Sequence, residues 1–376
     1  MTNIPFKKPI YITKPLLPDL KNVNEKLKEI WDSGWLTNFG AQHALLEKKL
    51  KKYLNVQHIS LFNNGTNALM IAIKALNLTG EVITTPFTFP ATPNSLTWNN
   101  ITPVFCDIDD KTMNIDADKI EKLITPKTSA ILAVHVFGTP CNIEKIQKIA
   151  NKHKLKVIYD AAHAFGTKIN GKGIGSFGDI TMFSFHATKL FHTIEGGALT
   201  FNDKNLKEKI NLLRNFGIKN EETVLAPGIN GKMNEIQAGI GLLVLNMMKK
   251  AKKTRKSLYE TYEKHLKNIN GIKLLQNKVN VKKSYQYFAV RINEEEFGTS
   301  RDKVYKQFKK YNVFTRKYFH PLCSEYQCYK HLQSAKITNL PVAQKIGKEV
   351  LCMPMHEGLS KKDIENICNI LKSFKK

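Results

Sequence analysis

A lysine stands between two histidines in the stretch SFHATKLFHTIEGGAL, which covers residues 184–199. This lysine, Lys189, follows Ser184 and precedes a glycine pair. A lysine amine can attack a carbonyl group when its surroundings lower its pKa. The paired glycines lack side chains and allow the backbone to approach closely. Lys189 is therefore the first candidate for chemistry.

A carboxylate is the second candidate. Asp160 ends the hydrophobic stretch LKVIYD and is followed by AAHAFG, which contains His163. A buried carboxylate without a partner is costly, so Asp160 requires a cation or a hydrogen-bond donor. His163 could supply that partner or pack over a ring. A structural role, in which Asp160 caps the next turn, stays open from these residues alone.

A phosphate cradle is the third candidate. In FNNGTNAL, an apolar stretch ends in small polar residues, and a helix is predicted to begin near Gly65 and Thr66. Free N–H groups and the helix dipole at such a start bind phosphate, and the Thr66 hydroxyl adds a donor. An ordinary helix N-cap that binds no ligand fits the same residues. Phe89, in TTPFTFPAT, could offer an aromatic face to a planar ligand or pack in the core.

The elements that must position these side chains alternate between apolar strands and amphipathic helices from about residue 58 to 200. This alternation predicts an α/β layer with a mostly parallel sheet. Ligands collect at the carboxyl ends of the strands in such sheets. We therefore expect the candidate residues at one edge. The predicted strands are HISLFNN, EVITTP, TPVFCDI, SAILAVHVFG, KVIYD, DITMFSF and GALTF.

The rest of the chain predicts a second, smaller domain. A long helical tract runs from about 234 to 269 and serves as a connector. After it we expect a strand in YQYFAVRI, a helix in SRDKVYKQFKKY, a strand in VFTRKYF and a terminal helix in SKKDIENICNILKSF. The prediction is a large domain over 1–245 and a small α+β domain over 246–376.

The net charge of +26 raises the possibility of a nucleic-acid or membrane partner. Only five of the cations are arginines, the residue that nucleic-acid readers favour, and the lysines lie mostly on helix-like stretches. A solvated surface explains them, so we expect neither nucleic acid nor membrane as a partner. A positive field would still favour anionic substrates. The six cysteines show no paired framework, and the chain begins without a signal-like apolar run, so we expect a cytoplasmic protein.

Two stretches resemble familiar binding motifs, but the neighbouring sequence does not fit the function of either motif. His320, Cys323 and Cys328 lack a fourth ligand and a common finger spacing, so no metal site is predicted. GKGIGSFG contains the G-x-G-x-x-G pattern, but it lies between a turn and a predicted strand instead of opening a helix. We interpret it as a glycine-rich hairpin.

Together, the lysine, the buried aspartate, the phosphate cradle and the aromatic ring suit pyridoxal 5'-phosphate. That cofactor needs a Schiff-base amine, a partner for its ring nitrogen, a cradle for its phosphate and a stacking face. Each residue has an ordinary structural explanation by itself. The combination at successive strand ends favours the cofactor.

The motifs NNGTNAL, TTPFTFPAT, DAAHAFG, SFHATK with EGGAL, and PGINGKMNEIQAGIGL resemble the DegT/DnrJ/EryC1/StrS family of pyridoxal-phosphate-dependent sugar aminotransferases. The resemblance spans essentially the whole chain and implies an aspartate-aminotransferase-like fold and a homodimer. It implies Lys189 as the Schiff-base and proton-carrying residue, with Asp160 as the partner of the ring nitrogen. By the same resemblance, His163 and Phe89 lie against the ring and Gly65, Thr66 and Ser184 hold the phosphate.

The resemblance also implies that Asn230 of GINGK reaches the phosphate of the other subunit, although Lys232 stands where many members have arginine. It implies glutamate as the amino donor and a nucleotide-linked keto-sugar as the acceptor. Pyridoxamine phosphate would form between the two half-reactions.

The segments WLTNFG and NVFTRKYFHPL look most like members that act at carbon 4 of dTDP-4-keto-6-deoxyglucose, giving dTDP-4-amino-4,6-dideoxyglucose. Tyr318, Phe319 and His320 would then face the sugar, or pack as part of the small domain. Three alternatives stay open: amination at carbon 3, another pyridoxal-phosphate reaction such as dehydration, and a basic nucleic-acid-binding protein. Retention of Lys189 favours transamination, because dehydratases of the family carry histidine there.

Overall fold

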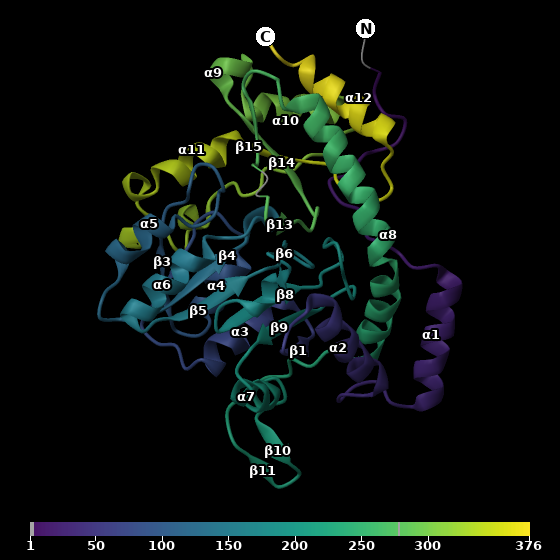
Figure 1. Ribbon diagram of the computed structural model, residues 1–376, viewed down its shortest axis with the longest axis vertical. Helices are drawn as coiled ribbons and strands as arrows, with labels where there is room; N and C mark the ends of the chain where they lie inside the picture. The colour runs from purple at the N-terminus through teal and green to yellow at the C-terminus, as the bar shows by residue number, and fades with distance from the viewer. Residues whose placement is uncertain (1–3, 277–278) are drawn as a thin grey trace.

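A seven-stranded sheet forms the centre of the protein, in a computed structural model that describes residues 4–276 and 279–376 (Figure 1). The strand order is β1-β9-β8-β5-β4-β2-β3. β9 runs antiparallel to its two neighbours, and the remaining pairs are parallel. The predicted α/β class with a mostly parallel sheet is confirmed. The strands are β1 (His58–Phe62), β2 (Glu81–Thr84), β3 (Thr102–Phe105), β4 (Thr128–Val134), β5 (Lys156–Asp160), β8 (Ile180–Ser184) and β9 (Gly197–Phe201).

Helices cover both faces of this sheet, so its inner strands are buried on both sides, as expected for parallel strands. α6 shows why such a segment is helical. Its apolar residues recur at helical spacing, the Asn142 side chain caps its first turn, and Lys154 ends it in the left-handed conformation. The helices of this region are α1 (Leu20–Ser33), α2 (Ala41–Leu54), α3 (Gly65–Ala75), α4 (Ala91–Thr97), α5 (Ala117–Ile120), α6 (Ile143–His153) and α7 (Asn205–Leu213).

The long helix α8 (Glu235–Leu266) connects this large body to a smaller one. It begins with a capping box between Asn234 and Gln237. Its first part packs against α1 and α2 and its last part against α12 (Figure 1). The predicted boundary at residue 245 lies inside this helix, and the division into two domains stays our proposal.

The small body is built on an antiparallel sheet in the order β12-β14-β15. Most of its helices pack on this sheet and on the second half of α8, around a separate cluster of buried apolar side chains, whereas Ala343 and Ile346 belong to a cluster shared with the loop after β3. Its elements are β12 (Ile272–Leu274), β14 (Phe288–Ile292), β15 (Val350–Met353), α9 (Glu294–Phe297), α10 (Arg301–Lys310), α11 (Pro341–Glu349) and α12 (Lys361–Lys372).

One predicted strand, VFTRKYF, is wrong. The segment makes only two isolated pairings, of Val313 with Ile10 and of Arg316 with Cys352. Its alternating burial arises because it passes between the N-terminal segment and β15 without forming a ladder with either. The glycine-rich stretch of residues 171–178 is a hairpin only at its start, where β6 (Lys168–Ile169) pairs with β7 (Lys172–Gly173), with β13 (Val281–Lys282) beside it. Its next residues, Ile174–Ser176, form a 3-10 helix, so the prediction is confirmed in part.

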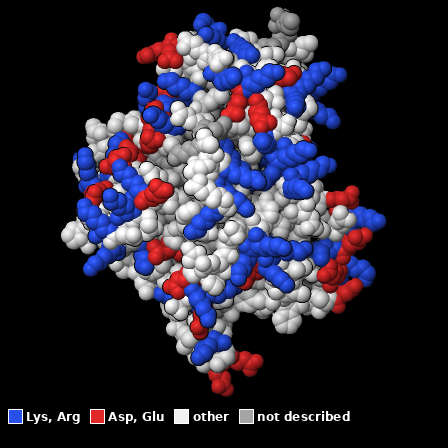
Figure 2. Space-filling model, in the orientation of Figure 1, with Lys and Arg blue, Asp and Glu red and all other residues white. Residues whose placement is uncertain are grey.

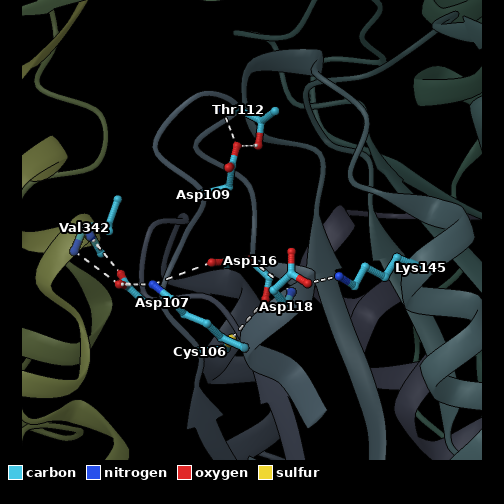
Figure 3. Close-up of polar contacts among 10 residues, drawn as sticks. Cys106, Asp107, Asp109, Thr112, Asp116, Asp118, Lys145 and Val342 are labelled. Carbon is cyan, nitrogen blue, oxygen red and sulfur yellow. Dashed lines mark hydrogen bonds and ion pairs between the residues drawn. The ribbon is translucent and has the colours of Figure 1, made fainter. Parts of the chain in front are cut away.

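An acid-rich loop after β3 attaches the small body to the central sheet. The buried Asp107 carboxylate accepts hydrogen bonds from the amides of Val342 and Ala343, at the start of α11. It also pairs with Lys119 at 2.9 Å. Asp109, in the same loop, bonds only within it, to the amide and hydroxyl of Thr112 (Figure 3). The loop thus fixes α11 through Asp107.

The visible surface carries Lys and Arg over most elements, with Asp and Glu among them (Figure 2). On this face the cations are spread out and do not form a single groove. Within the described ranges, no helix combines the length and apolar character needed to cross a bilayer.

Candidate active site

The candidate residues from four strands meet at one edge of the sheet. β8 ends at Ser184, β5 at Asp160, and β1 leads directly into Asn64 and Gly65. β9 runs antiparallel, so its first residue, Gly197, lies at the same edge. A side chain at 197 would come within 2.8 Å of the Asn64 and Gly65 backbone. The close backbone approach predicted for EGGAL is confirmed.

The start of α3 has the features of a phosphate cradle. The Asn64 side chain caps the helix through the amide of Asn67 at 2.8 Å. The amides of Gly65 and Thr66 have no protein acceptor among the described residues, and Thr66 is exposed. A Cβ at position 65 would lie 3.2 Å from that of Ser184, so the Ser184 side chain lies directly against the helix start. The Ser184 oxygen accepts from the His186 amide at 3.5 Å, which leaves its hydrogen to donate. The unpaired amides and this hydroxyl donor suit an anion.

The Asp160 carboxylate is buried, and both of its oxygens accept hydrogen bonds. Oδ1 accepts from the Ala162 amide at 3.0 Å, and Oδ2 accepts from the Thr92 hydroxyl at 2.9 Å. Burial raises the pKa of Asp160, while these two bonds and the Lys189 charge oppose the rise. Asp160 thus has a fixed orientation and a nearby cation, as its predicted role requires.

Lys189 lies on a tight loop between β8 and β9. Its amide donates to His186, and the loop is closed by bonds between Phe185 and Thr193 and between Phe185 and Gly196. The side chain is half-buried, and its Nζ has no hydrogen-bond acceptor in the described part of the chain. Burial lowers the pKa of Lys189 to about 8, with the Asp160 charge acting in the opposite direction. A pKa near 8 leaves about a tenth of the amine unprotonated at pH 7, far more than for an ordinary lysine.

His163 lies in a layer of aromatic rings that both bodies contribute. Its ring is nearly parallel to Phe137 and to Phe319 of the small body, with centroids 6.2 and 5.9 Å away. Burial, and then the Lys189 charge, lower its pKa well below the usual value, so the imidazole is neutral. Its buried Nδ1 has no hydrogen-bond partner among the described residues. A buried nitrogen without a partner fits a position against a ligand.

Phe89 lines a cavity of about 320 Å³, which Phe319, the ring stacked on His163, also lines. The ring is 54% exposed, so it is available to a ligand and is not a core residue. Tyr318, Phe319 and His320 line the same cavity, with Phe319 buried and His320 exposed. The full lining is Phe89, Pro90, Tyr305, Arg316, Lys317, Tyr318, Phe319, His320, Pro321 and Tyr326.

Two kinds of residue escaped prediction from the sequence. Arg316 and Lys317 add positive charge to the cavity, and Arg316 lies over the Tyr318 ring. The Thr92 hydroxyl donates a hydrogen bond to Asp160, although the two residues are 68 positions apart in the sequence. Arg316 and Lys317 directly precede the predicted Tyr318, so the sequence could have indicated them as cavity residues. The contact between Thr92 and Asp160 could not be predicted, because only the fold brings the two residues together.

Asn230 is exposed, and its carbonyl accepts from the Asn63 side chain of the same chain at 3.2 Å. Its backbone therefore lies beside the end of β1. The contact of Asn230 with the cofactor phosphate of a second subunit stays a prediction. The Lys232 Nζ donates a hydrogen bond to the side-chain oxygen of Asn215.

Two other features lie outside the site. A second cavity has a volume of about 370 Å³ and is lined by residues such as Lys156 and Asp179. These residues lie where β5 and β8 begin, at the edge of the sheet away from the candidate site. In the described ranges no group of His, Cys, Asp and Glu side chains is suited to a metal ion. The arrangement at the strand ends instead offers an anion cradle, a fixed carboxylate and a reactive amine, which fit the parts of pyridoxal phosphate.

Comparison with known proteins gives consistent matches. The model of the DegT/DnrJ/EryC1/StrS aminotransferase family matches residues 19–372. A dTDP-4-amino-4,6-dideoxy-D-glucose transaminase from Escherichia coli is 46% identical over 367 residues, covering 97% of this chain and 98% of the relative.

Solved structures agree in fold. DesI, crystallised in the presence of its TDP-sugar product, has a TM-score of 0.93 and 34% identity, covering 98% of this chain and 94% of its own. The PMP-form of the putative sugar aminotransferase Spr1654 from Streptococcus pneumoniae has a TM-score of 0.90 and 25% identity, covering 97% of each chain.

Proposed function

This chain belongs to the DegT/DnrJ/EryC1/StrS aminotransferase family, and on that premise we propose that it transfers an amino group to carbon 4 of dTDP-4-keto-6-deoxyglucose. The enzyme is a pyridoxal-phosphate-dependent sugar aminotransferase. The observation that carries the proposal is the placement of the Asp160 carboxylate at the end of β5, close enough to interact with the Lys189 amine on the loop that follows the neighbouring strand β8.

The cofactor would be held by the strand-end residues. The amides of Gly65 and Thr66 and the hydroxyl of Ser184 would bind its phosphate, with Asp160 at its ring nitrogen. His163 and Phe89 would lie against the ring. These assignments rest on the free amides of α3, the unpartnered Nδ1 of His163 and the exposed ring of Phe89.

Pyridoxal phosphate, when bound, supplies a carbonyl that accepts the donor's amino group and a ring that stabilises the resulting carbanion. Asp160 would hold a proton at the ring nitrogen: burial raises its pKa, whereas the Ala162 and Thr92 hydrogen bonds and the Lys189 charge favour its ionised form. The Lys189 Nζ accepts and releases a proton at its own nitrogen, because its pKa of about 8 lies near neutral pH. His163 is neutral and adds no competing charge.

The sugar nucleotide would occupy the cavity beside Phe89. Arg316 and Lys317 supply positive charge for the diphosphate, and Tyr318 and His320 supply polar atoms for the sugar. The choice of a dTDP-linked 4-keto-sugar is supported by the Escherichia coli relative and by DesI.

Glutamate is proposed as the donor, the cytoplasm as the compartment and a homodimer as the assembly. All six cysteines are free of disulfides, which supports a reducing environment. Exposed apolar side chains at Trp35, Phe216 and Leu225 support a protein partner. Asn230 would then come from the second subunit.

The test is the transfer of isotopic nitrogen. Purified protein with pyridoxal phosphate is incubated with ¹⁵N-glutamate and dTDP-4-keto-6-deoxyglucose. We expect release of 2-oxoglutarate and a product whose NMR spectrum shows ¹⁵N on carbon 4. Nitrogen on carbon 3, or no 2-oxoglutarate above a Lys189→Ala control, would reject the proposal. The same assay with GDP- and UDP-linked keto-sugars measures the preference for the base.

A further inference from the structure

Behind the Asp160 carboxylate lies a chain of buried hydroxyl groups. Thr92 is 0% exposed and Thr88 is 1% exposed, and their hydroxyl oxygens are 2.9 Å apart. Thr92 in turn donates to Oδ2 of Asp160 at 2.9 Å. All three groups are shielded from water, which makes each hydrogen bond electrostatically stronger than it would be in solvent.

The direction of this chain follows from the number of protons. A threonine hydroxyl has one hydrogen to donate and two lone pairs to accept with. The Thr92 hydrogen points to Asp160, so the bond between the two threonines must be donated by Thr88. Each donation polarises the next, and the sequence Thr88 to Thr92 to Asp160 favours a negative charge at its end.

We propose that Thr92, supported by Thr88, is a positioning residue that keeps the Asp160 carboxylate ionised and correctly oriented for the cofactor ring. The proposal rests on the proposed function for the identity of the ligand. Together with the Ala162 amide on Oδ1, the Thr92 hydroxyl on Oδ2 fixes the rotation of the carboxylate. Further lone pairs on the carboxylate oxygens stay available for a ring N–H.

Through its backbone, the segment that carries the two threonines also contacts the small body near the wall of the substrate cavity. The Cys323 thiol donates to the Thr88 carbonyl at 3.2 Å, and the Cys323 amide donates to Pro86 at 2.9 Å. Cys323 follows closely on Tyr318–Pro321, which line the cavity. Phe89 belongs to the same short segment as the two threonines. One segment of the large body therefore fixes the carboxylate, offers a ring to the cavity and contacts the small body.

The test replaces one hydroxyl. Thr92→Val keeps the shape of the side chain but removes the donor to Asp160. We expect the pH titration of the Asp160 carboxyl, followed by ¹³C NMR in the cofactor-free full chain, to move to higher pH. A hydrogen bond to a charged group contributes about 1.5 kcal/mol, so we also expect about tenfold weaker binding of pyridoxal phosphate. Thr92→Ser should restore both values, and Thr88→Val should shift both in the same direction by less.

The matched control is Thr84→Val. Thr84 is equally buried, but its hydroxyl donates to the Leu132 carbonyl, outside the chain of hydroxyls. An Asp160 titration in Thr92→Val that matches wild type, or a shift equally large in Thr84→Val, would overturn the proposal. If wild-type protein fails to bind pyridoxal phosphate, the proposed function fails, whereas the carboxyl titration still decides on the role of Thr92.

Discussion

At the scale of single residues, the lowered pKa of Lys189 results from two opposing effects. Burial disfavours the charged amine and lowers its pKa to about 8, and the nearby Asp160 carboxylate limits this decrease. The unprotonated form, which is the nucleophile, increases as the pH rises through this value. An ordinary surface lysine would reach the same state only near its usual pKa of 10.5.

The expected consequence is a pH-dependent capture of the cofactor. When cofactor-free protein is mixed with pyridoxal phosphate, the rate of the absorbance change should rise with pH and have a midpoint near pH 8. Asp160→Asn removes the charge that raises the pKa of Lys189, so its midpoint should lie at lower pH. A midpoint near that of a solvated lysine would show that burial does not tune the amine.

Prediction from sequence succeeds where a residue's role depends on its place at a strand end. Asp160, Ser184 and Gly65 each follow a recognisable apolar run, so their meeting at one edge follows from the parallel sheet. Thr92 and Arg316 follow no such rule. The Thr92 contact joins residues 68 apart in sequence, and the position of Arg316 depends on how the small body packs.

At the scale of elements, a carboxylate on the large body caps a helix of the small body. Asp107 accepts from two amides at the start of α11, where the helix dipole favours a negative charge (Figure 3). α11 packs close to Phe319 and Leu322, near the cavity wall. The cap therefore helps to set the position of the cavity relative to the candidate site at the strand ends.

We expect Asp107→Asn to lower the free energy of unfolding by about 1–2 kcal/mol, because the amide offers one acceptor oxygen where the carboxylate uses two and loses the ion pair with Lys119. The KM for the sugar nucleotide should rise, while the affinity for pyridoxal phosphate should stay close to wild type. Asp109→Asn is the control, since that carboxylate bonds only within its own loop. An equal rise in KM for both variants would contradict this role.

At the scale of the whole molecule, the sequence pattern predicted the α/β class but not the path of residues 313–319. Alternating burial alone cannot distinguish a strand in a ladder from an extended segment that lies between two others. The hairpin of β10 (Ile218–Asn220) and β11 (Thr223–Val224) projects from the large body (Figure 1). Its side chains of Ile218 and Val224 are exposed. Such a projection fits the proposed homodimer.

The dimer proposal makes a sharp prediction for Asn230. In mixed dimers of Lys189→Ala with Asn230→Ala, a residue that acts on the partner's site leaves one site with both groups intact. We therefore expect activity to return when the two inactive variants are unfolded and refolded together. If Asn230 serves its own chain, both sites stay defective and no activity returns. Light scattering should give twice the mass of one chain.

The central claim is that, in a chain rich in lysine, the amine at 189 is the one that binds the cofactor. Its most direct test is to incubate the protein with pyridoxal phosphate, reduce it with borohydride and locate the modification by peptide mass spectrometry. The account predicts a stable adduct on Lys189 that is absent from Lys189→Arg. An adduct spread over surface lysines, with Lys189 unmodified, would contradict it.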